Sequence, residues 1–143
     1  METRMDFVGE YFHSLDAKNR VFIPAKYREY LSGGFVLCKS PDKCLYIYSK
    51  EEWEEVAAQV KSLPGTENFR RYKRDFFKNA DIVDMDKQGR FTIKAELVDY
   101  AQLTKDIVIA GSGNKFEIWN AEQYNDDCGK TLSADELGIE VVF

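Results

Sequence analysis

An internal repeat constrains the fold of this chain more than any other feature of its sequence. The segment Asp16–Ala25, DAKNRVFIPA, aligns with Asp86–Ala95, DKQGRFTIKA, seventy positions later, and Asp, Arg, Ile and Ala occupy the same places in both. Two further pairs follow in the same order: Phe35–Leu37 matches Ile107–Ile109, and Leu45–Tyr48 matches Phe116–Trp119. An ordered series of matches favours duplication of one unit over chance similarity between short β-rich segments.

Each half of the chain is predicted to fold as strand, turn, strand, short helix and β-hairpin. In the first half we expect strands at Phe7–Leu15 and Val21–Ile23, a turn at Asp16–Asn19, a helix from Pro24 to about Leu31, and a hairpin of Phe35–Cys38 with Cys44–Tyr48. The second half repeats this order, with strands at Asp81–Met85 and Phe91–Ile93, a helix at Ala95–Ala101 and a hairpin around Gly111–Asn114. In the two turns, Gly89 can supply a positive φ, and Asn19 tolerates one next best.

The segment between the halves has helical periodicity. Ser49 precedes Glu52 by three residues, which is typical of a helix start, and apolar residues then recur until Pro64-Gly65 breaks the pattern. A second helix from about Thr66 carries Arg70, Arg71, Lys73 and Arg74, which we interpret as a solvated or intersubunit face more readily than a DNA-binding one. We expect the two helices to cover the β structure or, alternatively, to contact neighbouring protomers.

These elements predict a mainly β fold with helices, in the α+β class. We divide the chain into a first half-domain at 7–50, a helical hairpin at 51–79, a second half-domain at 80–122 and an acidic tail at 123–143. The tail segment Ile139–Phe143 either docks on a neighbour or frays.

The net charge of −5 at first argues against a polyanionic partner. From Asn120 to Phe143, however, six acidic residues accompany Lys130 alone, which accounts for the whole net charge, so the rest of the chain is balanced and can hold basic patches. No apolar run approaches the roughly 18 residues that a membrane helix needs. Glu2, Arg4 and Asp6 lie within the first ten positions, where a signal peptide would be apolar. Because the three cysteines follow no disulfide or ligand pattern, we expect a soluble cytoplasmic protein without membrane contact.

The two repeated turns present the candidate binding residues. Lys18 and Arg20 lie in the first turn, and Lys87 and Arg90 lie in the second. A guanidinium can grip a phosphate or the O6/N7 edge of guanine with two parallel hydrogen bonds. The aspartates that begin the two turns would repel DNA, so we expect them to hold the loops by local hydrogen bonds. A single charged turn is more often simply solvated than DNA-binding. The repetition of Asp and Arg in both turns makes DNA binding a stronger interpretation, but it does not by itself make it the favoured one.

The sequence contains few candidate catalytic or metal-binding residues. His13 is the only histidine, and an edge or structural role suits it better than catalysis. Cys38 and Cys44 could approach each other and form a partial zinc site with His13, but small buried hydrophobic side chains are the better interpretation. Gly111-Ser112-Gly113 is too short for a phosphate loop. We therefore predict a non-enzyme with no catalytic residue, no metal and no cofactor.

Three stretches of this sequence together carry a family likeness: Glu10–Ala25, EYFHSLDAKNRVFIPA, with Arg28; Asp86–Arg90, DKQGR; and Ile118-Trp119. In this ordered combination the chain resembles the MraZ family, and the likeness extends to about Asn125. The resemblance implies tandem AbrB/SpoVT-like half-domains that form a double-ψ, swapped-hairpin β-barrel, with protomers closing into a ring. It also implies regulation of transcription through short repeated DNA boxes upstream of a cell-division and cell-wall operon, in association with the nucleoid.

The resemblance assigns DNA contact first to Arg20, with Lys18, Lys87 and Arg90 behind it, and it includes Arg28 among the DNA-binding residues. Two departures stand out: Asn19 occupies a position where the family usually has Gly, and Lys94 replaces the proline expected before the second helix. A non-enzymatic protein-interaction or antitoxin-like role is the alternative, because related barrels serve in those roles too.

Overall fold

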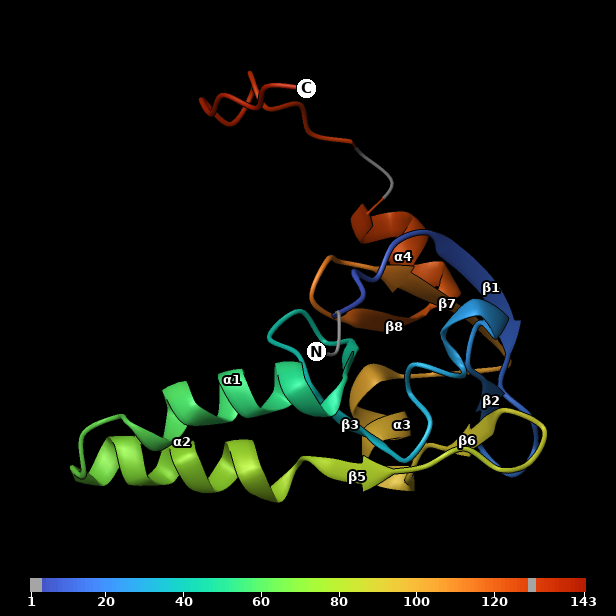
Figure 1. Cartoon of the computed structure of the whole chain (residues 1–143), viewed down its shortest axis with the longest axis horizontal. Coiled ribbons are helices and arrows are strands. Elements are labelled where there is room, and N and C mark those ends of the chain that lie inside the picture. Colours follow the sequence, from blue (N-terminus) through green and yellow to red (C-terminus); the bar gives the residue numbers. More distant parts are fainter. Residues whose placement is uncertain (1–3, 129–130) are drawn as a thin grey trace.

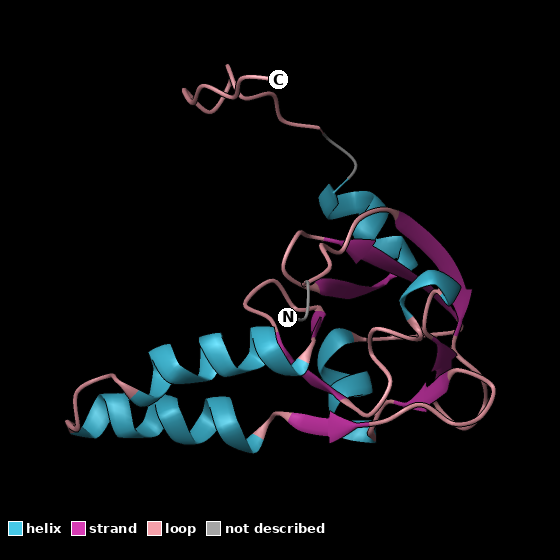
Figure 2. Cartoon of the chain, viewed as in Figure 1, coloured by secondary structure: helices cyan, strands magenta, loops and turns pink. Residues whose placement is uncertain are grey.

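The computed structural model describes residues 4–128 and 131–143, and it has mixed α and β content (Figures 1 and 2). Its elements in chain order are β1 (Glu10–Ser14), β2 (Arg20–Phe22), a 3-10 turn η1 (Ala25–Tyr27), β3 (Phe35–Lys39), β4 (Leu45–Tyr48), α1 (Lys50–Lys61), α2 (Glu67–Lys78), β5 (Asp81–Val83), β6 (Arg90–Thr92), α3 (Ala95–Ala101), β7 (Asp106–Gly111), β8 (Phe116–Asn120) and α4 (Ala121–Cys128). The predicted α+β class is confirmed. None of the helices in the described part of the chain has the length and apolarity needed to cross a bilayer.

Strands of both halves are mixed in one antiparallel sheet. Its order is β1-β7-β8-β4-β3-β5, so β1 and β4 of the first half pair with β7 and β8 of the second, and β5 pairs with β3. A separate two-stranded sheet joins β2 to β6, with Val21 opposite Phe91. Among the described elements these two sheets do not close into one barrel. The pairing nevertheless makes each half complete the hydrogen bonding of the other.

The core forms where the repeated apolar positions meet. Ile23 and its repeat partner Ile93 are both fully buried, and so are Tyr27 and Leu97 on the segments that follow them. Phe116 of β8 lies against Tyr27 with a ring-centroid distance of 4.8 Å. Burying an aliphatic or aromatic side chain of this size stabilises a fold by about 1.5–3 kcal/mol, so the duplicated pattern supplies much of the driving force.

Only one of the two central helices packs on the sheet. The Ser49 hydroxyl accepts a hydrogen bond from the Glu52 amide at 3.2 Å, which confirms the predicted start of α1, and Ala57 and Val60 bury the inner face of that helix. In contrast, α2 has no buried residue, and the helical pair projects from the body (Figure 1). The prediction that the pair covers the β structure is thus right for α1 and wrong for α2, whose apolar side chains pack partly on α1 and are partly open.

The predicted helix from Pro24 to Leu31 is wrong, because only the 3-10 turn η1 forms there. The Tyr27 hydroxyl donates to the Asp6 carbonyl at 3.1 Å and accepts from the Val8 amide at 3.0 Å, so the ring is held toward the N-terminal segment. These long-range contacts favour successive tight turns over a regular helix. The first strand is also shorter than predicted, because Gly9 has a φ of +93° and β1 begins only after it.

Candidate nucleic-acid interface

The first repeated turn is organised by one aspartate. The Asp16 carboxylate accepts the amides of Lys18 and Arg20 at 2.9 and 2.8 Å through one oxygen, and the Arg20 Nε at 2.7 Å through the other. Asn19 occupies the left-handed region with φ +58°, and its amide donates to the Asp16 carbonyl at 3.0 Å. The expectation that this aspartate holds its loop is therefore confirmed.

The second turn repeats this arrangement atom for atom. Asp86 accepts the amides of Gln88 and Arg90 at 2.9 and 3.0 Å and the Arg90 Nε at 2.9 Å. Gly89 supplies the positive φ of +84°, as the sequence predicts. Duplication has thus preserved a complete side-chain and backbone network in both halves.

The two turns are also joined to each other. The Ile23 amide donates to the Gly89 carbonyl at 2.9 Å, and the Ile93 amide donates to the Asn19 carbonyl at 2.8 Å. Because β2 and β6 pair directly beneath them, both loops emerge at the same end of the molecule, around the labels β2 and β6 in Figure 1. Figure 1 places this end away from residues 131–143.

The electrostatics of the turns favour ionised aspartates. Hydrogen bonding from the Arg20 amide lowers the pKa of Asp16 below its ordinary value, and the Arg90 amide does the same for Asp86, with the guanidinium groups adding to both effects. The side chains of Arg20 and Arg90 keep 30% and 24% of their surface exposed. Since each arginine uses Nε for its aspartate, and no hydrogen bond among the described residues engages the terminal nitrogens, those nitrogens can bind an external acceptor.

Arg28 links the two turns. Its Nε donates to the Ile23 carbonyl at 2.9 Å, and its guanidinium lies 5.5 Å from the centre of the Phe22 ring. It also crosses the second loop so closely that a Cβ at Gly89 would lie 2.6 Å from Nε. Beside it lies a shallow pocket of about 290 Å³, lined by Arg28, Ser32 and the second loop from Asp84 to Gly89.

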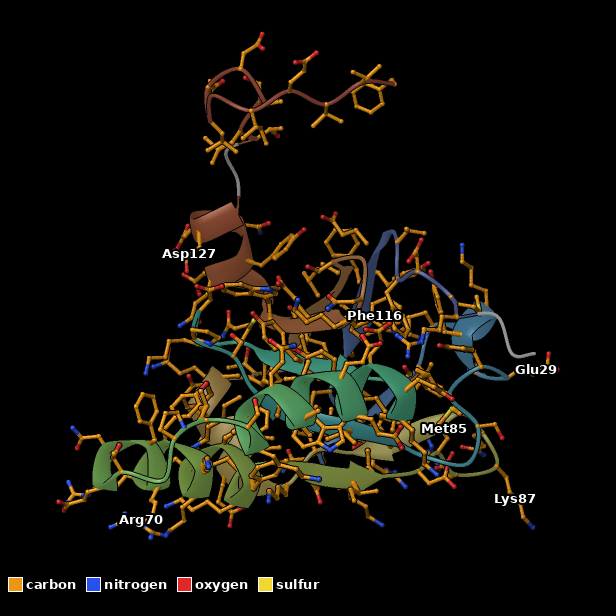
Figure 3. The ribbon with its side chains drawn as sticks, turned by 60° about the vertical axis from the view of Figure 1, so that its left-hand side comes forward. Glu29, Arg70, Met85, Lys87, Phe116 and Asp127 are labelled. Atoms are coloured by element: carbon orange, nitrogen blue, oxygen red, sulfur yellow. The ribbon has the colours of Figure 1, made fainter. Side chains whose placement is uncertain are left out.

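The structure therefore gathers the sequence-predicted residues at one end. Lys18 and Lys87 are exposed on the two loops, and Figure 3 shows Lys87 extending outward. Lys94 is half-buried and precedes α3, without a capping hydrogen bond from its side chain. Sequence analysis missed the role of Phe22, whose half-exposed ring supports Arg28, because an apolar residue in a strand gives no sign of such a contact.

In the part of the chain that the structure describes, His13 does not join Cys38 and Cys44 in a metal centre. Within residues 4–128 and 131–143 no group of three or more His, Cys, Asp or Glu side chains could hold a metal ion. Burial, with a smaller effect of Arg28, lowers the pKa of His13, so the ring is neutral at pH 7. Burial raises the pKa of Cys38 to about 12, which keeps its thiol protonated.

The basic residues of α2 form a separate surface. Arg70 donates to the Gly65 carbonyl, Lys73 donates to the Leu63 carbonyl at 2.7 Å, and Arg71 pairs with Glu67 at 3.3 Å. Figure 3 places Arg70 at the far end from Lys87. These cations are partly used within the helical hairpin and do not extend the surface made by the two loops.

Comparison with known proteins gives matches over most of the chain. The sequence model of the family described as "MraZ protein, putative antitoxin-like" matches twice in tandem, at residues 7–75 and 76–135. A relative from Carboxydothermus hydrogenoformans is 42% identical over 95% of this chain and 96% of its own length. Relatives from Clostridium tetani and Acetivibrio thermocellus are 46% and 44% identical, over 84% and 92% of this chain and 87% and 93% of their own lengths. All three are named transcriptional regulator MraZ.

Proposed function

Because this chain belongs to the MraZ family, whose relatives described above are named transcriptional regulators, we propose that it regulates transcription by binding double-stranded DNA with its paired turns. One observation carries the proposal above all others. Two identical Asp–Arg networks are hydrogen-bonded to each other and present partly exposed guanidinium groups at one end of the molecule. No enzyme activity is part of this proposal, in agreement with the names of the relatives.

The geometry suggests how the arginines bind. Anchoring Nε to a carboxylate fixes the plane of the guanidinium and leaves the terminal nitrogens for a phosphate or a guanine edge. Ordering the side chain before binding lowers the entropy lost in the complex. Arg20 is our first candidate for base recognition and Arg90 its counterpart, while Lys18, Lys87 and Arg28 supply phosphate contacts around them.

The acidic total charge does not oppose this function. The acids of the last 24 residues lie on α4 and beyond it, away from the paired turns (Figure 1). Screening at physiological salt limits repulsion between exposed charges to about 8 Å, so the local cations dominate at the loop end.

We further propose a swapped-hairpin β-barrel formed by the two half-domains and a ring of several protomers. Each protomer would contribute a few phosphate contacts, and a rigid assembly on repeated promoter boxes can gain about 10²–10⁴ in avidity. The target we propose is the promoter of the protein's own cell-division and cell-wall operon, and the location is the cytoplasm in association with the nucleoid.

A mobility-shift assay with Arg20→Ala tests the proposal. The probe is a duplex from upstream of the protein's own gene, and an unrelated duplex of equal length is the competitor. We expect specific retardation to be lost while native mass spectrometry shows an unchanged assembly. Arg71→Ala is the matched control, since Arg71 is an exposed arginine on α2, and it should bind as wild type does. Wild-type affinity of Arg20→Ala would refute the assignment.

The alternative is a non-enzymatic protein-interaction or antitoxin-like module, which the description of the matched family also names. The same assay distinguishes the two. A regulator retards its own upstream region in preference to unrelated DNA at moderate salt, whereas an interaction module shows no such preference.

A further inference from the structure

The segment 131–143 carries an uncovered apolar surface. Six of its side chains are each more than half exposed: Leu132, Leu137, Ile139, Val141, Val142 and Phe143. All hydrogen bonds described for this segment join residues within 133–139, and the segment extends away from the rest of the chain (Figure 1). A concentration of exposed apolar side chains marks an interaction site, so this segment requires a surface to cover it.

A groove with matching apolar character lies outside the paired turns, and none of their residues lines it. It is formed between the outer face of the β3–β4 hairpin and α2, and its volume is about 410 Å³. We call it the aromatic groove, because the rings that line it are Tyr46, Tyr48, Tyr72, Phe76 and Tyr100. Tyr72 is 55% exposed, although it stacks on Phe76 at a centroid distance of 6.4 Å. Concave apolar sites with a few polar groups are typical binding sites.

Lysines surround the groove. The ammonium groups of Lys39 and Lys43 lie 4.8 and 4.9 Å from the centre of the Tyr100 ring, and that of Lys115 lies 4.7 Å from the Tyr46 ring. The tail segment has the opposite charge, with Asp135, Glu136 and Glu140 among its apolar residues. Asp75 also lines the groove, and Asp42 and Glu117 lie close enough to act on the Tyr46 ring, so the rim carries charges of both signs. The tail segment therefore matches the groove through its apolar side chains, and the three lysines can pair with its carboxylates.

We propose that residues 137–143 of one protomer bind in the aromatic groove of a second copy of this chain. In an extended conformation, Ile139, Val141 and Phe143 share one face, which suits insertion between the rings, while Glu140 faces the lysine rim. A second copy is the proposed source because the segment leads away from its own body. The contact is independent of the paired turns, so it does not rest on the proposed DNA binding.

Photocrosslinking in the full-length chain tests this contact. Phe143 is replaced by p-benzoylphenylalanine, and the variant is mixed with an equal amount of unmodified chain uniformly labelled with ¹⁵N. After irradiation, mass spectrometry should find the probe joined to labelled peptides that contain Tyr46, Tyr72 or Tyr100. Crosslinks confined to the same chain, crosslinks to another surface, or the absence of inter-chain crosslinks would each overturn the proposal.

Charge reversal gives a second test that does not endanger the core. Because Lys43 is exposed and Lys39 is half-buried at the rim, Lys39→Glu with Lys43→Glu should leave the fold intact, which far-UV circular dichroism verifies. In the labelled partner chain this pair should lower the crosslink yield by about threefold or more, and Glu140→Lys in the probe chain should restore it, because like charges across an interface oppose binding. Lys61→Glu with Lys105→Glu is the matched control. An unchanged yield in the rim variant would contradict the assigned groove.

Discussion

Replacing Gly89 by alanine should destabilise the protein through Arg28 as well as through the backbone. Gly89 has a φ of +84°, and a Cβ there would lie 2.6 Å from Arg28 Nε and 2.7 Å from its Cδ. A left-handed conformation costs a residue with a side chain about 1–2 kcal/mol. The Arg28 side chain would also have to leave its place across the loop, losing its hydrogen bond to the Ile23 carbonyl and its contact with the Phe22 ring.

The size of the effect can be estimated from these contacts. The hydrogen bond contributes about 0.5–1.5 kcal/mol and the guanidinium–ring contact about 0.5–1 kcal/mol, and with the backbone cost this gives about 2–4.5 kcal/mol for Gly89→Ala. Gly33→Ala is the matched control, because Gly33 has a φ of +90° and nothing lies within 4 Å of the position of its Cβ. That control should lose only about 1–2 kcal/mol.

Urea unfolding monitored by circular dichroism measures both free energies, and a double variant isolates the coupling. In an Arg28→Ala background the clash is absent, so Gly89→Ala should cost about the same 1–2 kcal/mol as Gly33→Ala. If Gly89→Ala costs the same with and without the Arg28 side chain, Arg28 does not lie across the second loop, and the reasoning about this end of the molecule fails.

Three further substitutions test other parts of the structure. Asp86→Asn should weaken DNA binding, because it frees the Arg90 side chain, and a binding titration measures this loss. In the wild type, the Asp86 carboxylate stabilises the fold above its ordinary pKa of 3.8, and this contribution should disappear as the pH falls through its lowered pKa. Unfolding at a series of pH values measures that second effect. Because burial and Arg28 lower the pKa of His13, the wild type should lose stability as the pH falls below 6.5, and His13→Gln should lose less between pH 8 and pH 5 in the same unfolding assay. Ser49→Ala removes the cap of α1 and should lower the free energy of unfolding by about 1 kcal/mol, while Ser112→Ala, in an exposed hairpin loop, should change it little.

The repeat made the two loops predictable from sequence, and the spacing of Ser49 and Glu52 did the same for the start of α1. Local hydrogen bonding specifies these features: Asp16 and Asp86 need only residues within four positions to close their loops, and the Ser49 hydroxyl needs only Glu52. Short-range chemistry of this kind can be read directly from residue types and spacing.

Features set by distant contacts were not predictable in the same way. The turn at Ala25–Tyr27 is held by hydrogen bonds between the Tyr27 hydroxyl and the backbone of Asp6 and Val8, 21 and 19 residues away, and no periodicity encodes them. The exposure of α2 was not predictable either, because an amphipathic pattern predicts a helix but does not identify the surface that covers its apolar face. The meeting of Arg28 with Gly89 likewise requires both halves to be in place.

The exchange of strands between the halves has a consequence for how the protein is made. When the first half leaves the ribosome, β1, β2 and β4 cannot yet pair with their partners. Those partners, β7, β6 and β8 respectively, have not been synthesised at that point. Pairings between segments about seventy to a hundred residues apart form slowly, since a long loop must close first. Nascent chains should therefore remain incompletely folded until translation nears its end, and a ribosome stalled after residue 80 should hold a protease-sensitive polypeptide.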